Sequence, residues 1–153
     1  MQISSTRRGF LRGLIAVGAM LAVPVTLLAA MVRPQAAFKA DSAAASIQAL
    51  FGQDATEAAD KINLKVPDIA ENGAVVPVTV STDLDGVESI TVIIDNNPTP
   101  LSAVFNLTDA LDAEVSTRVK MGKSSPVRAV VKAQGKVYYT SKEVKVTIGG
   151  CGG

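Results

Sequence analysis

The sequence predicts an all-β protein with the architecture of an immunoglobulin-like β-sandwich, preceded by a short helix and followed by a flexible Gly-Gly-Cys-Gly-Gly arm. From Ile62 onward, apolar and polar residues alternate in about seven short runs. Turn residues separate these runs, and that spacing is typical of a sandwich of half-buried strands. The 153-residue chain has no Trp and one Cys, so the Cys–Trp–Cys set of antibody domains is absent. The immunoglobulin likeness is therefore one of architecture only.

Residues 1–45 are predicted to be a twin-arginine export signal. Arg7 and Arg8 stand shortly before a run from Gly13 to Val32 that contains no charged residue. A receptor reads such an arginine pair as an address, and small residues at 42–45 offer cleavage sites. A permanent transmembrane helix is the alternative, because twenty apolar residues can span a bilayer. Pro24, the many Ala and Gly residues and the arginine pair favour a cleaved signal and a periplasmic location.

A helix is predicted over 43–51. The segment consists largely of good helix formers, Asp41 or Ser42 can cap its start, and Gly52 can end it. The polar, Ala-rich segment 53–61 is either a second helical turn or a loop.

The predicted sandwich domain covers 46–148. Asn72-Gly73 and the polar residues 83–86 mark turns, the prolines of 96–100 exclude a helix, and Gln134-Gly135 is predicted to form a tight hairpin turn. Alternation places strands at 62–66, 76–80, 90–94, 101–107, 115–121, 127–133 and 137–148.

Two strands also carry an apolar residue on the face opposite the predicted core, namely Ile93 and Val130. An outer face in contact with water would be polar there. We therefore expect an apolar patch that binds a second β-sandwich protein in a stable heterodimer.

The amino-acid composition excludes many kinds of metal site and catalytic site. The chain has no His and one Cys, which removes the usual ligands of zinc, haem and iron–sulfur sites and every catalytic arrangement with a His base. We expect no cofactor and no metal. The 15 basic and 14 acidic residues nearly cancel, and removal of residues 1–45 leaves a net charge of −3, so no nucleic-acid partner is expected.

The last five residues, 149–153, form the predicted arm. Gly149, Gly150, Gly152 and Gly153 surround Cys151, the only thiol of the chain. Glycine loses the most conformational freedom on ordering, so the arm should be mobile, with a reach of roughly 17 Å when extended. No Lys, Arg or His on the arm stabilises a thiolate, and an ordinary Cys is only a few per cent ionised at neutral pH. Cys151 is thus expected to be a covalent attachment point and not a catalyst.

The thiol allows other interpretations. The thiol could be incidental in a periplasmic binding or chaperone module, although odd cysteines in exported proteins are uncommon because they cross-link. A stand-alone thiol enzyme conflicts with the absence of His. The diglycine end also suggests a ubiquitin-like sulfur carrier, but such a protein would need a helix packed across a small sheet, and the strand pattern argues against that fold. An exposed Cys151 should also join two copies of the chain through a disulfide.

A family resemblance is carried by the twin-arginine leader and by Pro67–Gly73, Val76–Val78, Ala113–Arg118 and Lys142–Gly153, above all by the terminal pentapeptide. On these residues, the sequence resembles the SoxY family of bacterial sulfur oxidation, whose members are carrier subunits of SoxYZ complexes. The loop Asn96-Asn97-Pro98 departs slightly from the Gly-Asn-Pro expected there.

The resemblance implies a cycle of reactions on Cys151 by other proteins. A haem enzyme, SoxXA, joins thiosulfate oxidatively to Cys151, and a hydrolase, SoxB, releases the outer sulfonate as sulfate. In some organisms a sulfane dehydrogenase oxidises the remaining sulfur. The resemblance also implies a heterodimer with SoxZ, a second sandwich that has no leader and is exported with its partner.

Overall fold

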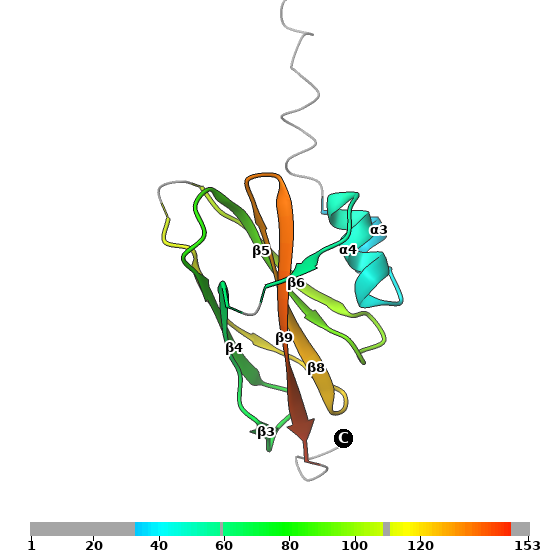
Figure 1. Cartoon of the computed structure of the whole chain (residues 1–153). Helices are drawn as coiled ribbons and strands as arrows, with labels where there is room; N and C mark the ends of the chain where they lie inside the picture. Colours follow the sequence, from blue (N-terminus) through cyan, green and yellow to red (C-terminus); the bar gives the residue numbers. More distant parts are fainter. Residues whose placement is uncertain (1–32, 59, 109–110, 148–153) are drawn as a thin grey trace, which may run out of the picture. The chain divides into compact units, whose positions relative to one another are not determined.

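The computed structural model describes residues 33–58, 60–108 and 111–147, and the chain divides into two compact units, 1–33 and 34–153. Within the second unit, two sheets face each other (Figure 1). The larger sheet has the strand order β1-β9-β8-β5-β6, with β3 also paired to β9, and the smaller sheet has the order β2-β4-β7. The elements are α3 (Gln35–Phe38), α4 (Ala43–Phe51), β1 (Thr56–Glu57), β2 (Ile62–Lys65), β3 (Ile69–Ala70), β4 (Val76–Thr82), β5 (Val87–Ile94), β6 (Leu101–Asn106), β7 (Glu114–Val119), β8 (Ser125–Ala133) and β9 (Lys136–Val146).

Local sequence explains the best-defined boundaries. The Ser42 hydroxyl accepts a hydrogen bond from the backbone N–H of Ala45 and starts α4, and Gly52 ends it in the left-handed conformation at φ 66°. Gln134 and Gly135 both have positive φ, 50° and 73°, which is the geometry that a two-residue hairpin between β8 and β9 requires. The predicted helix and the predicted hairpin are confirmed.

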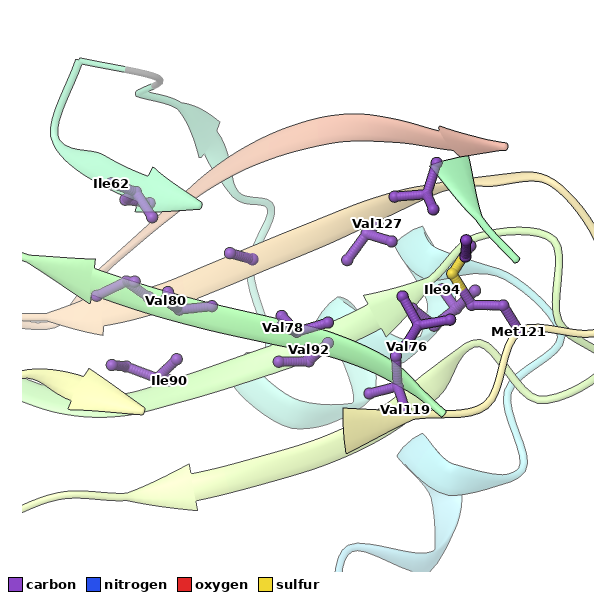
Figure 2. Close-up of a cluster of buried hydrophobic side chains, with 14 of the residues drawn as sticks. Ile62, Val76, Val78, Val80, Ile90, Val92, Ile94, Val119, Met121 and Val127 are labelled. Carbon is purple, nitrogen blue, oxygen red and sulfur yellow. The ribbon is translucent and has the colours of Figure 1, made fainter. Parts of the chain in front are cut away.

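The core lies between the two sheets and is almost entirely aliphatic (Figure 2). Alternate residues of β4, β5 and β8 point into it, as the period-two pattern predicts. The core side chains from these strands are Val76, Val78, Val80, Ile90, Val92, Ile94, Val127, Ala129, Val131 and Ala133. The all-β sandwich prediction is therefore confirmed.

The outer face of the larger sheet carries a second apolar cluster, and here one prediction is wrong. Ile93 and Val130 are 0% exposed. They pack with Leu101 and Val137 beneath residues of α3 and α4, including Ala37 and Ile47. The chain's own helices cover these side chains, so Ile93 and Val130 do not form a patch for a partner. Their apolar character serves folding within the chain.

Three further features were not predicted from sequence. The segment 53–61 contains the two-residue strand β1, β3 is also only two residues long, and α3 lies within the predicted export signal. The predicted boundary at 45/46 falls inside α4. Arg7, Arg8 and the apolar run to Val32 lie outside the described residues. Among those that are described, no helix is long and apolar enough to cross a membrane.

Candidate functional site

Strand β9 is the element that leads to the predicted attachment residue. It runs beside β8 in the larger sheet and ends at Val146 (Figure 1). Cys151 and the four glycines around it lie outside the described residues. The candidate site is therefore described as far as Thr147, which precedes Cys151 by four positions.

The end of β9 is held on both sides. On one side, parallel pairing with β3 brings the backbone N–H of Lys145 to the Asp68 carbonyl oxygen at 2.9 Å and that of Thr147 to the Ala70 carbonyl oxygen at 3.1 Å. On the other side, the Ser124 hydroxyl oxygen accepts from the Val146 N–H at 2.9 Å. The last three described residues of the chain are thus fixed by backbone donors that all find acceptors.

The turn after β3 packs directly on this strand end. The Asn72 side-chain oxygen accepts from the Ala74 N–H at 2.9 Å, an Asx-turn that confirms the turn expected at Asn72-Gly73. The Gly73 carbonyl accepts from the Met121 N–H at 2.7 Å. A Cβ on Gly73 would lie 2.4 Å from the Met121 carbonyl oxygen and 2.9 Å from a Val146 methyl carbon. Only glycine fits this contact.

Two more loops join the same end of the sandwich. The Asn97 side chain donates to the Lys120 carbonyl at 2.8 Å and accepts from the Gly122 N–H at 3.1 Å. The Asn96 side chain donates to the Ser124 carbonyl at 3.0 Å. The two asparagines therefore tie the β5–β6 loop to the β7–β8 loop. We call the end of β9 with the loops 67–75, 95–100 and 120–124 the arm pole.

One ion pair reinforces the arm pole, between the Lys142 ammonium and the Asp68 carboxylate at 2.9 Å. The hydrogen bond from Lys142, and then its charge, hold the pKa of Asp68 below its ordinary value of 3.8. The pair is exposed to solvent, so it orients the loop more than it stabilises the fold.

The described residues contain no cluster of three or more His, Cys, Asp or Glu side chains that could hold a metal ion. Two hollows occur among the described residues. One, of about 400 Å³, is polar and lies between β2 and β9, lined by residues such as Asn63, Thr140 and Lys142. The other, of about 240 Å³, lies beside α4, where Arg128 contacts the ring of Tyr139 and pairs with Asp95 at 2.7 Å.

Sequence reasoning named Cys151 and its glycines but missed the residues that hold the strand before them. Pro67–Gly73 was noted for the family resemblance, and the structure gives it a mechanical role. Ser124 carried no signal in the sequence, since one hydroxyl that binds a backbone group 22 residues away follows no pattern.

Two comparisons with known proteins identify the same family. The model of the family described as sulfur oxidation protein SoxY matches residues 47–151. A solved structure of the sulfur carrier protein SoxY from Chlorobium limicola f thiosulfatophilum is similar at 42% identity and a TM-score of 0.61, covering 67% of this chain and 94% of that chain. A chain from a structure of the superantigen toxic shock syndrome toxin-1 matches at 10% identity and a TM-score of 0.40, too low for any argument. A search of the curated proteins found no match.

Proposed function

The chain belongs to the SoxY family of sulfur oxidation proteins, and we propose that it carries thiosulfate-derived sulfur covalently on Cys151. One observation carries the proposal. The family match ends at residue 151, so it includes the only thiol of the chain. The solved structure at 42% identity is named a sulfur carrier protein, which supports the same role.

The proposed chemistry begins with one two-electron oxidation at sulfur, which a hydrolysis follows. Cys151 thiolate and thiosulfate form a sulfur–sulfur bond and release two electrons to a haem enzyme of the SoxXA kind, which leaves an S-thiosulfonate on the protein. Water then attacks the terminal sulfonate in a hydrolase of the SoxB kind. This step releases sulfate and two protons and leaves a persulfide on Cys151. A sulfane dehydrogenase would oxidise that remaining sulfur where the organism has one.

The chain itself supplies no catalyst in this proposal. An ordinary thiol with no His in the whole sequence to act as a base is a poor nucleophilic catalyst but a serviceable attachment point. The S-thiosulfonate and the persulfide are both cleaved by exchange or hydrolysis, so the intermediate can be loaded and released. No cofactor is needed on this chain, and the proposed role is that of a non-enzymatic substrate carrier.

We place this carrier in the periplasm, exported through Arg7 and Arg8 together with a SoxZ-like β-sandwich partner. The twin-arginine route exports folded proteins, often ones that bind a cofactor or a partner before export. Because this chain lacks the usual ligands of a metal cofactor, we infer that it binds a partner protein before export. Strands β6 and β7 each end a sheet and have one edge unpaired within the described part of the chain. Such edges are natural sites for association with another β-protein.

Intact mass measurement tests the carrier proposal most directly. Protein purified without reductant from thiosulfate-grown cells should carry adducts of thiosulfonate or additional sulfur atoms that dithiothreitol removes. A Cys151→Ser variant should carry none and should fold normally. An unmodified thiol in every preparation would refute the proposal and favour a binding or chaperone module with an incidental thiol.

Co-expression tests the partner. The chain and a leaderless β-sandwich protein of the SoxZ kind should elute as a one-to-one complex in which Cys151 still reacts with iodoacetamide. A chain that is a well-folded monomer and binds no such protein would contradict the heterodimer and leave the covalent carrier role untouched.

A further inference from the structure

Strand β9 continues beyond the point where its antiparallel neighbour begins. The pairing between β8 and β9 starts at Ser125 opposite Val144. Lys145, Val146 and Thr147 therefore have no partner on β8. Without other support, β9 would end at Val144.

Three hydrogen bonds from outside β8 hold these last residues. The Lys145 and Thr147 N–H groups donate to carbonyls of the segment 67–75, and the Val146 N–H donates to the Ser124 hydroxyl. The acceptors lie on both flanks of the strand because successive backbone N–H groups point in opposite directions. We call the segment 67–75 together with Ser124 the clasp.

The clasp is itself fixed in place by several independent contacts. Ala70 is buried in the core of the sandwich. The Asx-turn at Asn72 shapes the loop, and the Gly73 carbonyl binds the Met121 N–H at 2.7 Å. Gly73 also lies too close to Met121 and Val146 for any side chain. These contacts fix the loop independently of the strand end that it supports.

We propose that the clasp sets where the carrier arm begins, by extending the anchored part of β9 from Val144 to Thr147. The functional consequence rests on the carrier role proposed above. Thr147 lies four positions before Cys151, and Val144 lies seven positions before it. Because the effective concentration of a tethered group falls roughly as the −3/2 power of tether length, loss of the clasp should dilute the thiol at a docked enzyme about two- to threefold.

Two pairs of variants test the anchor. Gly73→Ala places a methyl group against Met121 and Val146, whereas Gly122→Ala, in the neighbouring loop, meets only the Asn97 side-chain oxygen at 3.9 Å. Ser124→Ala removes the acceptor for Val146, and Ser124→Thr restores it. Ser116→Ala is the matched control, since it removes an exposed hydroxyl that pairs with Thr79 far from β9.

Amide hydrogen exchange of the folded full chain is the readout. Gly73→Ala should speed the exchange of Lys145, Val146 and Thr147 at least tenfold while Val127 and Val144 keep their protection. Ser124→Ala should speed Val146 severalfold and Ser124→Thr should not. Both controls should match the wild type. Unchanged exchange at 145–147 in Ser124→Ala would overturn the proposal even if Gly73→Ala fails to fold.

A kinetic measurement connects the clasp to the carrier role. With the enzymes that act on Cys151, Gly73→Ala should raise the apparent KM for the carrier by up to about two- to threefold and leave kcat unchanged, whereas Gly122→Ala should leave both unchanged. An equal fall in kcat would contradict an effect on arm position. If exchange responds as expected but Cys151 never carries an adduct, the carrier role fails and the clasp stands as a structural feature.

Discussion

The Thr91 hydroxyl offers a sharp test of the packing on the outer face of the larger sheet. Thr91 lies on β5 opposite Val104 of β6 and Val130 of β8, and it is 0% exposed. Its side-chain oxygen has no hydrogen-bond partner among the described residues. A buried hydroxyl without a partner costs about 1–3 kcal/mol relative to its hydrated state. Thr91→Val replaces that hydroxyl with a methyl group of nearly the same size.

We expect Thr91→Val to raise the free energy of unfolding by about 1 kcal/mol, the lower end of that range, because the methyl group fills the same space among valine side chains. For a domain of this size the gain corresponds to a Tm increase of roughly 3–5 °C. Urea unfolding followed by circular dichroism measures it as a higher midpoint with an unchanged slope. Thr79→Val is the control, since the Thr79 hydroxyl pairs with Ser116 at 2.9 Å and its loss should lower stability slightly. A loss of stability in Thr91→Val would show that its hydroxyl is bonded in solution and would refute the reasoning.

Three other outcomes follow from the structure. Ile93→Ala should cost about 2–4 kcal/mol of unfolding free energy, while Ile69→Ala, at a position 56% exposed, should change it by less than about 0.5 kcal/mol. Equal effects would mean that α3 and α4 do not cover Ile93 in solution. The hydrogen bond from Lys132, and then that from the Gly135 N–H, lower the pKa of Glu88, so its stabilisation is present above the ordinary value of 4.5 and is lost as the pH falls through the lowered value. Glu88→Gln should therefore be less stable than the wild type at pH 7, and the difference in unfolding free energy should shrink as the pH falls below 4.5. A difference that stays constant as the pH falls would contradict the assignment. Air oxidation should give a dimer linked by a Cys151–Cys151 disulfide, which a reductant should convert back to monomer. The Cys151→Ser variant should form no such dimer, and a non-reducing gel that shows only wild-type monomer would mean that the thiol is shielded.

Most of the sandwich could be predicted from the sequence because strands of six or more residues show a clear period of two. Val76, Val78 and Val80 alternate with Pro77, Thr79 and Ser81, and all three valines point into the core. The two-residue strands β1 and β3 are too short to show any period. The error at Ile93 and Val130 has a different cause. Alternation shows that a side chain lies on the second face of a sheet but not what covers that face, and here the cover is α3 and α4, more than 40 residues earlier in the chain.

The candidate site, like the fold, could be predicted from the sequence only in part. Cys151 and its glycines could be named from composition alone, because a single thiol among glycines is unusual in any context. The anchoring of β9 could not be predicted, because it consists of individual bonds that loops make with one another and with the strand end, such as those from Asn97 to Lys120 and from Val146 to Ser124. Each such bond needs only one polar group at one position, and no periodic pattern in the sequence predicts it.

Glycine serves two opposite purposes in this chain. Gly73 is required because its neighbours are too close for a side chain, and its φ is not positive, so space and not backbone freedom selects it. The glycines around Cys151 are explained, in the carrier proposal, by the freedom they give to a chain that must enter the active sites of other proteins. The close packing at Gly73 makes the freedom of the glycines around Cys151 useful. A flexible tether concentrates a thiol near an enzyme only if its fixed end is well defined, because uncertainty at the anchor adds to the volume that the thiol explores. Under the carrier proposal, a short arm therefore requires a fixed starting point. The bonds of Lys145, Val146 and Thr147 to the clasp supply that point four positions before Cys151.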